Sequence, residues 1–159
     1  MSPAIRSFLF LCFFCILFQA EAQQKTPLLA VSKVIDGDTF WVINSRGQEE
    51  KIRLIGINTP ESRNTGRTKI EYFGKEATAF AKKTLTGKRV RLEYDVQRTD
   101  RYKRTLAYVY LENGMFFNAL LLQEGYARVA TYPPNVKYQS QFINHQKRAM
   151  DLRRGLWKN

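Results

Sequence analysis

The sequence has only two cysteines, Cys12 and Cys15, and both lie within its first 22 residues. The rest of the chain therefore has no disulfide framework and depends on an ordinary hydrophobic core. The roughly 137 remaining residues are enough to build one such core, which predicts a single domain. No internal repeat or low-complexity segment divides the chain further.

Long apolar segments are also missing. The longest run, at 8–18, has 11 residues, whereas a helix needs about 20 to cross a bilayer. Arg6 precedes this run, and Ala20-Glu21-Ala22 has the small-residue spacing of a cleavage site. Residues 1–22 are therefore predicted to be a secretory signal peptide, with an uncleaved membrane anchor as the alternative. Residues 23–28 are expected to form a short tail before a domain at 29–159.

Acidic residues and histidine are scarce. The chain has 26 basic and 14 acidic residues, and its net charge of +12 does not change when Arg6 and Glu21 are removed with residues 1–22. Such a charge favours a polyanionic partner, most commonly nucleic acid, although an anionic envelope surface or a solubilising role would give the same total. The lone histidine, His145, is interpreted as a surface or packing residue rather than a catalytic one.

Apolar periodicity predicts five short strands and three helices. The strands are expected at 28–34, 39–43, 48–57, 90–94 and 104–111, and the helices at 71–85, 117–123 and 139–154. Residues 127–130 are expected to pair briefly with the sheet. The buried side of the last helix is predicted to contain Phe142, Ile143, Ala149, Met150 and Leu152. This order favours an α+β domain built on a small, closed OB-type β-barrel, preceded by the signal peptide.

Two segments, at 34–42 and 52–61, each begin with apolar residues typical of a strand and end in polar residues. Two neighbouring strands could bring Asp38, Arg53, Asn58 and Glu61 into one pocket. Oxygen ligands of this kind suit Ca²⁺ or Mg²⁺. An arginine and a spare carboxylate beside the metal are what phosphodiester hydrolysis requires.

These residues also have simpler interpretations. Asp36 and Asp38 flank a glycine in a turn, where aspartate is common. Glu61 follows a Thr-Pro pair that can start a turn, and Arg53 can occupy the polar face of a half-exposed strand. Arg104 belongs to a basic segment that can simply be a solvated turn. Taken singly, none of these residues establishes a catalytic site.

Four motifs in order resemble the staphylococcal nuclease (thermonuclease) family over about residues 29–157. They are Ile-Asp-Gly-Asp-Thr at 35–39, Arg-Leu-Ile-Gly-Ile-Asn-Thr-Pro-Glu at 53–61, Tyr-Phe-Gly-Lys-Glu-Ala at 72–77 and Arg-Thr-Asp-Arg-Tyr-Lys-Arg-Thr-Leu-Ala-Tyr at 98–108. The resemblance implies an OB-fold barrel with three helices. It also implies Ca²⁺-dependent cleavage of DNA and RNA that leaves 3′-phosphates.

The resemblance assigns a role to each matching position. Asp38 corresponds to the first metal-binding carboxylate, and Thr59 to the residue whose backbone carbonyl binds the metal. Arg53 and Arg104 correspond to the two arginines, and Glu61 to the general base. The chemistry agrees, because attack on a phosphodiester adds negative charge that guanidinium groups can stabilise, while a carboxylate can deprotonate the attacking water.

Two positions depart from the family pattern. Asn58 replaces the usual second aspartate, so the site loses one negative charge and is predicted to bind Ca²⁺ more weakly. Lys103 replaces the glycine before Arg104. If this position needs a positive φ, the lysine is strained and can displace Arg104, or else its ammonium contacts substrate. Tyr102 and Tyr132 are predicted to stack on a base or sugar of the substrate.

The leading hypothesis is a secreted, monomeric, metal-dependent nuclease that acts on single-stranded or locally open DNA and RNA with little sequence preference and no protein partner. One alternative is a catalytically weak or silent OB module that binds nucleic acid or another polyanion. Another is adhesion to an anionic cell surface through charge alone. The joint presence of Arg53, Glu61 and Arg104 favours the enzyme.

Overall fold

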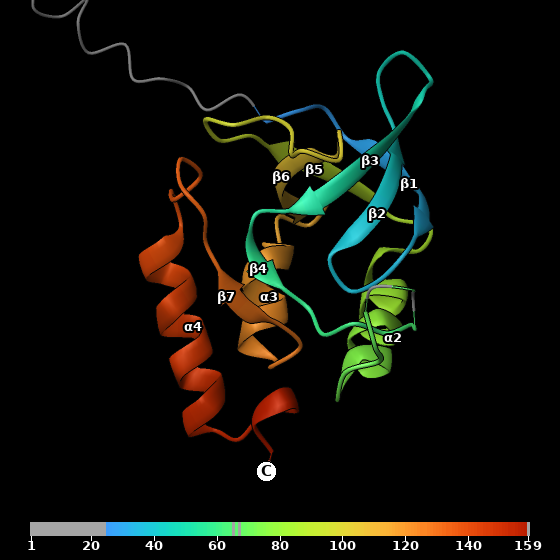
Figure 1. The fold of residues 1–159 in the computed structure, drawn as a ribbon. Coiled ribbons are helices and arrows are strands. Elements are labelled where there is room, and N and C mark those ends of the chain that lie inside the picture. Colours follow the sequence, from blue (N-terminus) through green and yellow to red (C-terminus); the bar gives the residue numbers. More distant parts are fainter. Residues whose placement is uncertain (1–24, 65, 67, 159) are drawn as a thin grey trace, which may run out of the picture.

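The computed structural model describes residues 25–64, 66 and 68–158, so the predicted signal peptide lies outside the described residues. Five strands close into a barrel in the order β1 (Leu29–Val34), β2 (Thr39–Ile43), β3 (Glu49–Leu54), β6 (Thr105–Leu111) and β5 (Arg89–Glu93) (Figure 1). All neighbours are antiparallel except β3 and β6, which are parallel. The predicted five-stranded barrel is confirmed.

Three helices accompany the barrel, as predicted. They are α2 (Gly74–Leu85), α3 (Phe117–Gln123) and α4 (Gln139–Asp151), and the short 3₁₀ helix η1 (Gly155–Trp157) follows. In Figure 1, α2 lies below β1 and β2, while α4 lies on the other side of the molecule, beside α3. Ala77, Ala81 and Leu85 form the buried stripe of α2 at helical spacing. Within the described part of the chain, no helix is long and apolar enough to cross a membrane.

The predicted continuous strand at 48–57 is wrong, because the chain turns after β3. Gly56 has a φ of +77°, a left-handed conformation that a residue with a side chain adopts only with strain. The chain then forms β4 (Gly56–Asn58), which pairs outside the barrel with β7 (Arg128–Ala130). A Cβ atom at Gly56 would lie 2.6 Å from the ring of Phe142, so the glycine also allows α4 to pack closely against β4.

The buried polar residue Asn118 fixes the chain where β3 ends. Its Nδ2 donates to the Ile55 carbonyl at 2.9 Å, and its Oδ1 accepts the Val109 N–H at 2.9 Å. One side chain therefore joins α3, β6 and the segment between β3 and β4. Because both bonds are buried, loss of either partner would leave an unpaired polar group at a cost of about 1–3 kcal/mol.

The buried side of α4 is narrower than predicted. Phe142 and Ala149 are buried, but Ile143, Met150 and Leu152 are 49%, 46% and 52% exposed. A helix that covers one side of a small barrel buries only a narrow stripe, so the residues at its margins stay in solvent. The helix also ends earlier than predicted, at Asp151 rather than 154. His145 is partly buried beside Gln123, in agreement with a packing residue.

The first residues of the described chain are attached to the barrel rather than extended as a tail. The Thr26 N–H donates to the Leu92 carbonyl at 2.8 Å, and the Leu92 N–H donates to the Thr26 hydroxyl at 2.9 Å. Nearby, the buried carboxylate of Glu93 accepts a 2.7 Å bond from Lys137 Nζ and a 2.8 Å bond from the Tyr138 hydroxyl. These bonds join β5 to the segment that precedes α4.

The start of α2 fixes the long loop that follows β4. The Glu71 N–H donates to the Glu61 carbonyl at 2.9 Å, and the Glu61 N–H donates to Glu71 Oε2 at 3.1 Å. The helix begins at Gly74 rather than at residue 71, because Phe73 adopts a left-handed backbone conformation with a φ of 68°. A Cβ atom at Gly74 would collide with the Glu61 carbonyl. Glycine is therefore required for this close backbone approach.

We expect Gly74→Ala to destabilise the protein by about 1–3 kcal/mol, because the added methyl group must push the 61–71 loop away from α2. Urea unfolding of the variant and the wild type would measure the change. Gly66→Ala is the matched control, since a Cβ atom there would meet no atom within 4 Å. A Gly74→Ala variant as stable as the control would contradict this packing argument.

Candidate active site

The carboxylate of Asp38 is the centre of the site. Asp38 directly precedes β2 and is only 6% exposed. Its Oδ2 accepts bonds from the Thr59 N–H at 2.8 Å and the Thr59 hydroxyl at 3.1 Å, and it pairs with Arg53 Nη1 at 2.9 Å. Its Oδ1 accepts a 3.1 Å bond from the Thr39 hydroxyl. The structure therefore brings together three predicted site residues: Asp38 just before β2, Arg53 in β3 and Thr59 just after β4.

The guanidinium of Arg53 is held by the protein from several directions. Besides Asp38, Nη1 donates to the carbonyls of Leu54 at 3.3 Å and Ile57 at 3.2 Å, and Nη2 donates to Asn58 Oδ1 at 2.8 Å. The side chain is 15% exposed, so one side of it remains open to solvent. Arg53 thus contacts two of the three predicted metal ligands and is fixed before any substrate arrives.

A second carboxylate, Asp36, lies beside Asp38. Asp36 Oδ1 accepts the Asp38 N–H at 3.2 Å. Burial, together with the negative charge of Asp38, raises the pKa of Asp36 to about 6, against the opposing effects of the Asp38 N–H bond and of Arg53. Two neighbouring carboxylates in a partly buried position are stabilised by a cation. The sequence places this residue in the Asp-Gly-Asp turn, and it is not among the predicted metal ligands Asp38, Asn58 and Thr59.

The chemistry of this cluster fits one hard divalent cation. Carboxylate oxygens of Asp36 and Asp38, the amide oxygen of Asn58 and the predicted carbonyl ligand of Thr59 are all ligands that Ca²⁺ and Mg²⁺ prefer. Among the described residues, no group of three or more His, Cys, Asp or Glu side chains could hold a metal ion. The candidate ligands named above include two carboxylates, and an ion held by few charged ligands keeps more of its water molecules.

Arg104 is positioned by a charged turn between β5 and β6. Its Nε and Nη2 both bond to Asp100 Oδ2 at 2.7 Å, and its N–H donates to Asp100 Oδ1 at 3.0 Å. Burial would raise the pKa of Asp100, but the hydrogen bonds and charge of Arg104 hold that pKa below its usual value. Sequence analysis had assigned no role to Asp100, and only its spacing of four residues from Arg104 could have suggested this ion pair.

Lys103 occupies the position where the family usually has glycine, and its φ is 60°. The condition on which the strained interpretation depends, a positive φ at this position, is therefore met. Its N–H donates to the Asp100 carbonyl at 3.0 Å, and the Asp100 N–H donates to the Arg104 carbonyl at 3.1 Å, so the turn keeps its hydrogen bonds. Arg104 remains paired with Asp100 in this strained turn, although the left-handed region costs a lysine roughly 1 kcal/mol.

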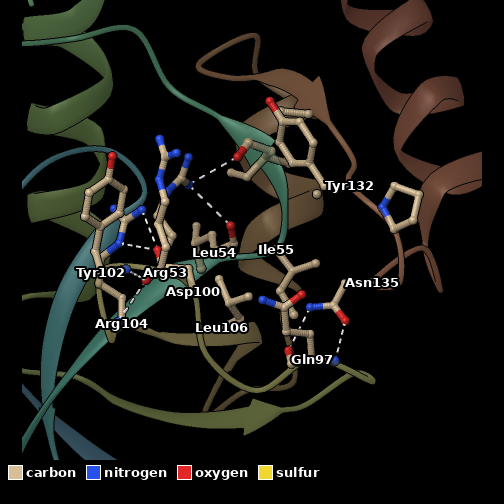
Figure 2. Close-up of a pocket in the computed structure, with 15 residues that line it drawn as sticks. Arg53, Leu54, Ile55, Gln97, Asp100, Tyr102, Arg104, Leu106, Tyr132 and Asn135 are labelled. Atoms are coloured by element: carbon tan, nitrogen blue, oxygen red, sulfur yellow. Dashed lines mark hydrogen bonds and ion pairs between the residues drawn. The ribbon is translucent and has the colours of Figure 1, made fainter.

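Arg53 and Arg104 line one open groove of about 610 Å³ (Figure 2). Tyr102 and Tyr132 also line it and are 59% and 75% exposed. The guanidinium groups of Arg101 and Arg104 lie 4.9 and 5.5 Å from the centre of the Tyr102 ring. Lys103 is exposed but is not part of the groove lining. The groove is therefore basic and aromatic, as expected for a nucleic-acid site.

One wall of the groove is held by Asn135, which is only 4% exposed. Its Oδ1 accepts the Gln97 N–H at 2.7 Å, and its Nδ2 donates to the Gln97 carbonyl at 2.8 Å. The sequence indicated only a chain break at Pro133-Pro134-Asn135. The pairing with Gln97 was not predictable, because the two residues are 38 positions apart and no motif links them.

Glu61 follows Thr59 and Pro60 and therefore lies on the segment that also carries the Asp38 contact. Its backbone is fixed by Glu71, as described above, while its side chain is exposed and forms no hydrogen bond with another described residue. Glu61 is not among the residues that line the groove. Glu61 thus lies two residues after Thr59, a candidate metal ligand, and its carboxylate oxygens are open to solvent.

Comparisons with known proteins agree with this arrangement. The family described as staphylococcal nuclease homologue matches residues 51–159. The thermonuclease of Staphylococcus hyicus is 46% identical over 129 residues, which cover 81% of this chain and 75% of that protein. The thermonuclease of Staphylococcus intermedius is 48% identical over 128 residues, which cover 80% of this chain and 74% of that protein. Endonuclease YncB of Bacillus subtilis is 34% identical over 140 residues, which cover 87% of this chain and 65% of that protein.

These matches extend over most of the barrel and the helices, and the family match includes Arg53, Glu61 and Arg104. The resemblance predicted from four short motifs is confirmed, together with the prediction of an enzyme that cleaves nucleic acid. The chain therefore belongs to the staphylococcal nuclease family and is a nuclease.

Proposed function

We propose that this nuclease is secreted, depends on Ca²⁺, and hydrolyses DNA and RNA in single-stranded or locally open regions, with little sequence preference and 3′-phosphate products. The observation that carries the proposal is the placement of two arginines in one groove, with the oxygen-rich Asp38 cluster directly beside Arg53. This combination offers positive charge for a phosphate and oxygen ligands for a cation in neighbouring positions.

Arg53 and Arg104 are proposed to bind the scissile phosphate. A phosphodiester gains negative charge on its oxygens as water attacks, so fixed donors stabilise that state more than the ground state. Both guanidinium groups are held in advance, Arg53 by Asp38 and main-chain carbonyls, and Arg104 by Asp100. Such preorganisation means that little rearrangement is needed at the moment of reaction.

Asp38, Asn58 and Thr59 are proposed to hold Ca²⁺, with Asp36 adding negative charge nearby. The bound ion would supply positive charge to the phosphate and lower the pKa of a coordinated water. Glu61 is the proposed general base, because its side chain is open to solvent while its backbone is fixed by Glu71, just before α2. A carboxylate in this position can accept the proton of the attacking water.

The groove also supports the proposed substrate range. Tyr102 and Tyr132 can stack on bases or sugars, and stacking tolerates every base because each has a π face. Lys103 lies in the same turn as Tyr102 and is proposed to add positive charge that attracts the phosphate backbone of the substrate. Phosphate contacts of this kind predict binding that weakens steeply as salt rises. Export through residues 1–22 and action as a monomer complete the proposal.

We expect Glu61→Ala and Arg104→Ala each to lower kcat by about 10²–10³ with single-stranded DNA and Ca²⁺, because each removes a group that acts in the transition state. Initial rates with purified residues 23–159 would measure the loss. Arg91→Ala, an exposed change on β5, is the charge-matched control for Arg104. DNA that the wild type binds but leaves intact with Ca²⁺ would instead indicate a binding module.

We expect Asn58→Asp to strengthen Ca²⁺ binding about tenfold, because it restores a negative charge beside Asp38. Calcium titration of the activity, and calorimetry without substrate, would measure the change. Asn44→Asp adds the same charge in the β2–β3 turn, where Oδ1 accepts the N–H groups of Arg46 and Gln48, and it should leave the calcium dependence as it was. An unaltered calcium requirement in Asn58→Asp would overturn the proposed role of this residue.

Lys103→Gly separates the two interpretations of this position. Because φ is 60° and the side chain does not line the groove, we expect the glycine variant to gain about 0.5–1 kcal/mol of stability. Urea unfolding measures this gain, and DNA binding is measured in parallel. A several-fold loss of affinity with no gain in stability would show that the ammonium group acts mainly by contacting substrate.

A further inference from the structure

A second pocket, of about 290 Å³, lies on the α2 side of the Asp38–Glu61 region. Three basic residues, Arg63, Lys75 and Lys82, and two hydroxyl residues, Ser62 and Thr78, line it. None of the described residues in its lining is acidic. It differs in this respect from the groove, where Asp100 pairs with Arg104.

The described part of the chain provides no acidic partner for the two lysines of this pocket. Lys75 and Lys82 form no ion pair with another described residue, and both side chains are exposed. Thr78 is 9% exposed, and its buried Oγ1 has no hydrogen-bond partner in the described part of the chain. Gathered cations of this kind attract an anion.

This pocket adjoins the proposed reacting residues through continuous chain. Ser62 directly follows Glu61, and α2 begins against the Glu61 carbonyl one residue before Lys75. Arg63 Nη2 donates to the Ile35 carbonyl at 3.5 Å, next to Asp36. Figure 1 shows the segment after β4 leading away from β7 and toward α2. The pocket therefore lies next to the segment that carries Glu61, on its α2 side.

We infer that this pocket binds a second phosphate of the same polynucleotide, while Arg53 and Arg104 hold the scissile one. The inference rests on the proposed function of the groove and defines the substrate as a chain long enough to reach both positions. It gives a role to the basic residues of this pocket, two of which, Lys75 and Lys82, have no ion-pair partner among the described residues. It also predicts that the enzyme prefers oligonucleotides to dinucleotides.

The first test measures binding without catalysis. Fluorescence anisotropy with single-stranded DNA of about 12 nucleotides, in the presence of a chelator, gives the affinity over a series of salt concentrations. We expect the double variant Lys75→Gln/Lys82→Gln to bind about five- to tenfold more weakly, with a salt slope smaller by about 1. The matched control is Lys83→Gln/Lys88→Gln, which removes the same charge from exposed positions outside the pocket.

The second test compares substrates of different length. The ratio of kcat/KM for the oligonucleotide to kcat/KM for a dinucleotide should fall about fivefold in Lys75→Gln/Lys82→Gln and stay at the wild-type value in the control. Equal losses of affinity in both double variants, or an unchanged ratio, would overturn the second phosphate site. Absence of cleavage by the wild type would overturn the proposed function instead, and the anisotropy experiment would still decide whether the pocket binds phosphate.

Discussion

The buried carboxylate of Asp38 is the interaction on which the site depends. It accepts bonds from Thr39, Thr59 and Arg53, and so it joins the start of β2 to β3 and to the segment after β4. A buried charge is tolerated only when it is well paired, and removal of one partner leaves the other unsatisfied. The same contact that fixes the ends of these strands therefore also brings the proposed metal ligands and the first arginine together.

The cluster that prepares the site also limits it. Arg53 pairs with Asp38 Oδ2 and donates to Asn58 Oδ1, two of the oxygens proposed to bind the cation. A bound ion would therefore compete with the guanidinium group for the same oxygen atoms. Because asparagine rather than aspartate stands at position 58, the ligands carry less negative charge. This gives a structural reason to expect weak metal binding in this chain.

Much of the fold could be predicted from the sequence, because alternation and helical periodicity reflect burial directly. The barrel strands, the helix at 117–123 and the meeting of Asp38, Arg53 and Asn58 all followed from local patterns. The break at Gly56 could not be predicted, since the alternating apolar pattern continues through a glycine whose φ depends on packing against Phe142. Exposure of Ile143 and Met150 depends on how much of α4 the barrel can cover, which periodicity alone does not give.

The parallel pairing of β3 with β6 has a consequence for how this enzyme can vary. Arg53 lies opposite Leu106 in that pairing, and Arg104 stands two residues before Leu106, just ahead of β6. The separation of the two arginines is therefore set by main-chain hydrogen bonds inside a closed barrel and not by the length of a loop. Loops around the groove can therefore gain or lose residues without changing this separation, which is the spacing proposed to hold a single phosphate.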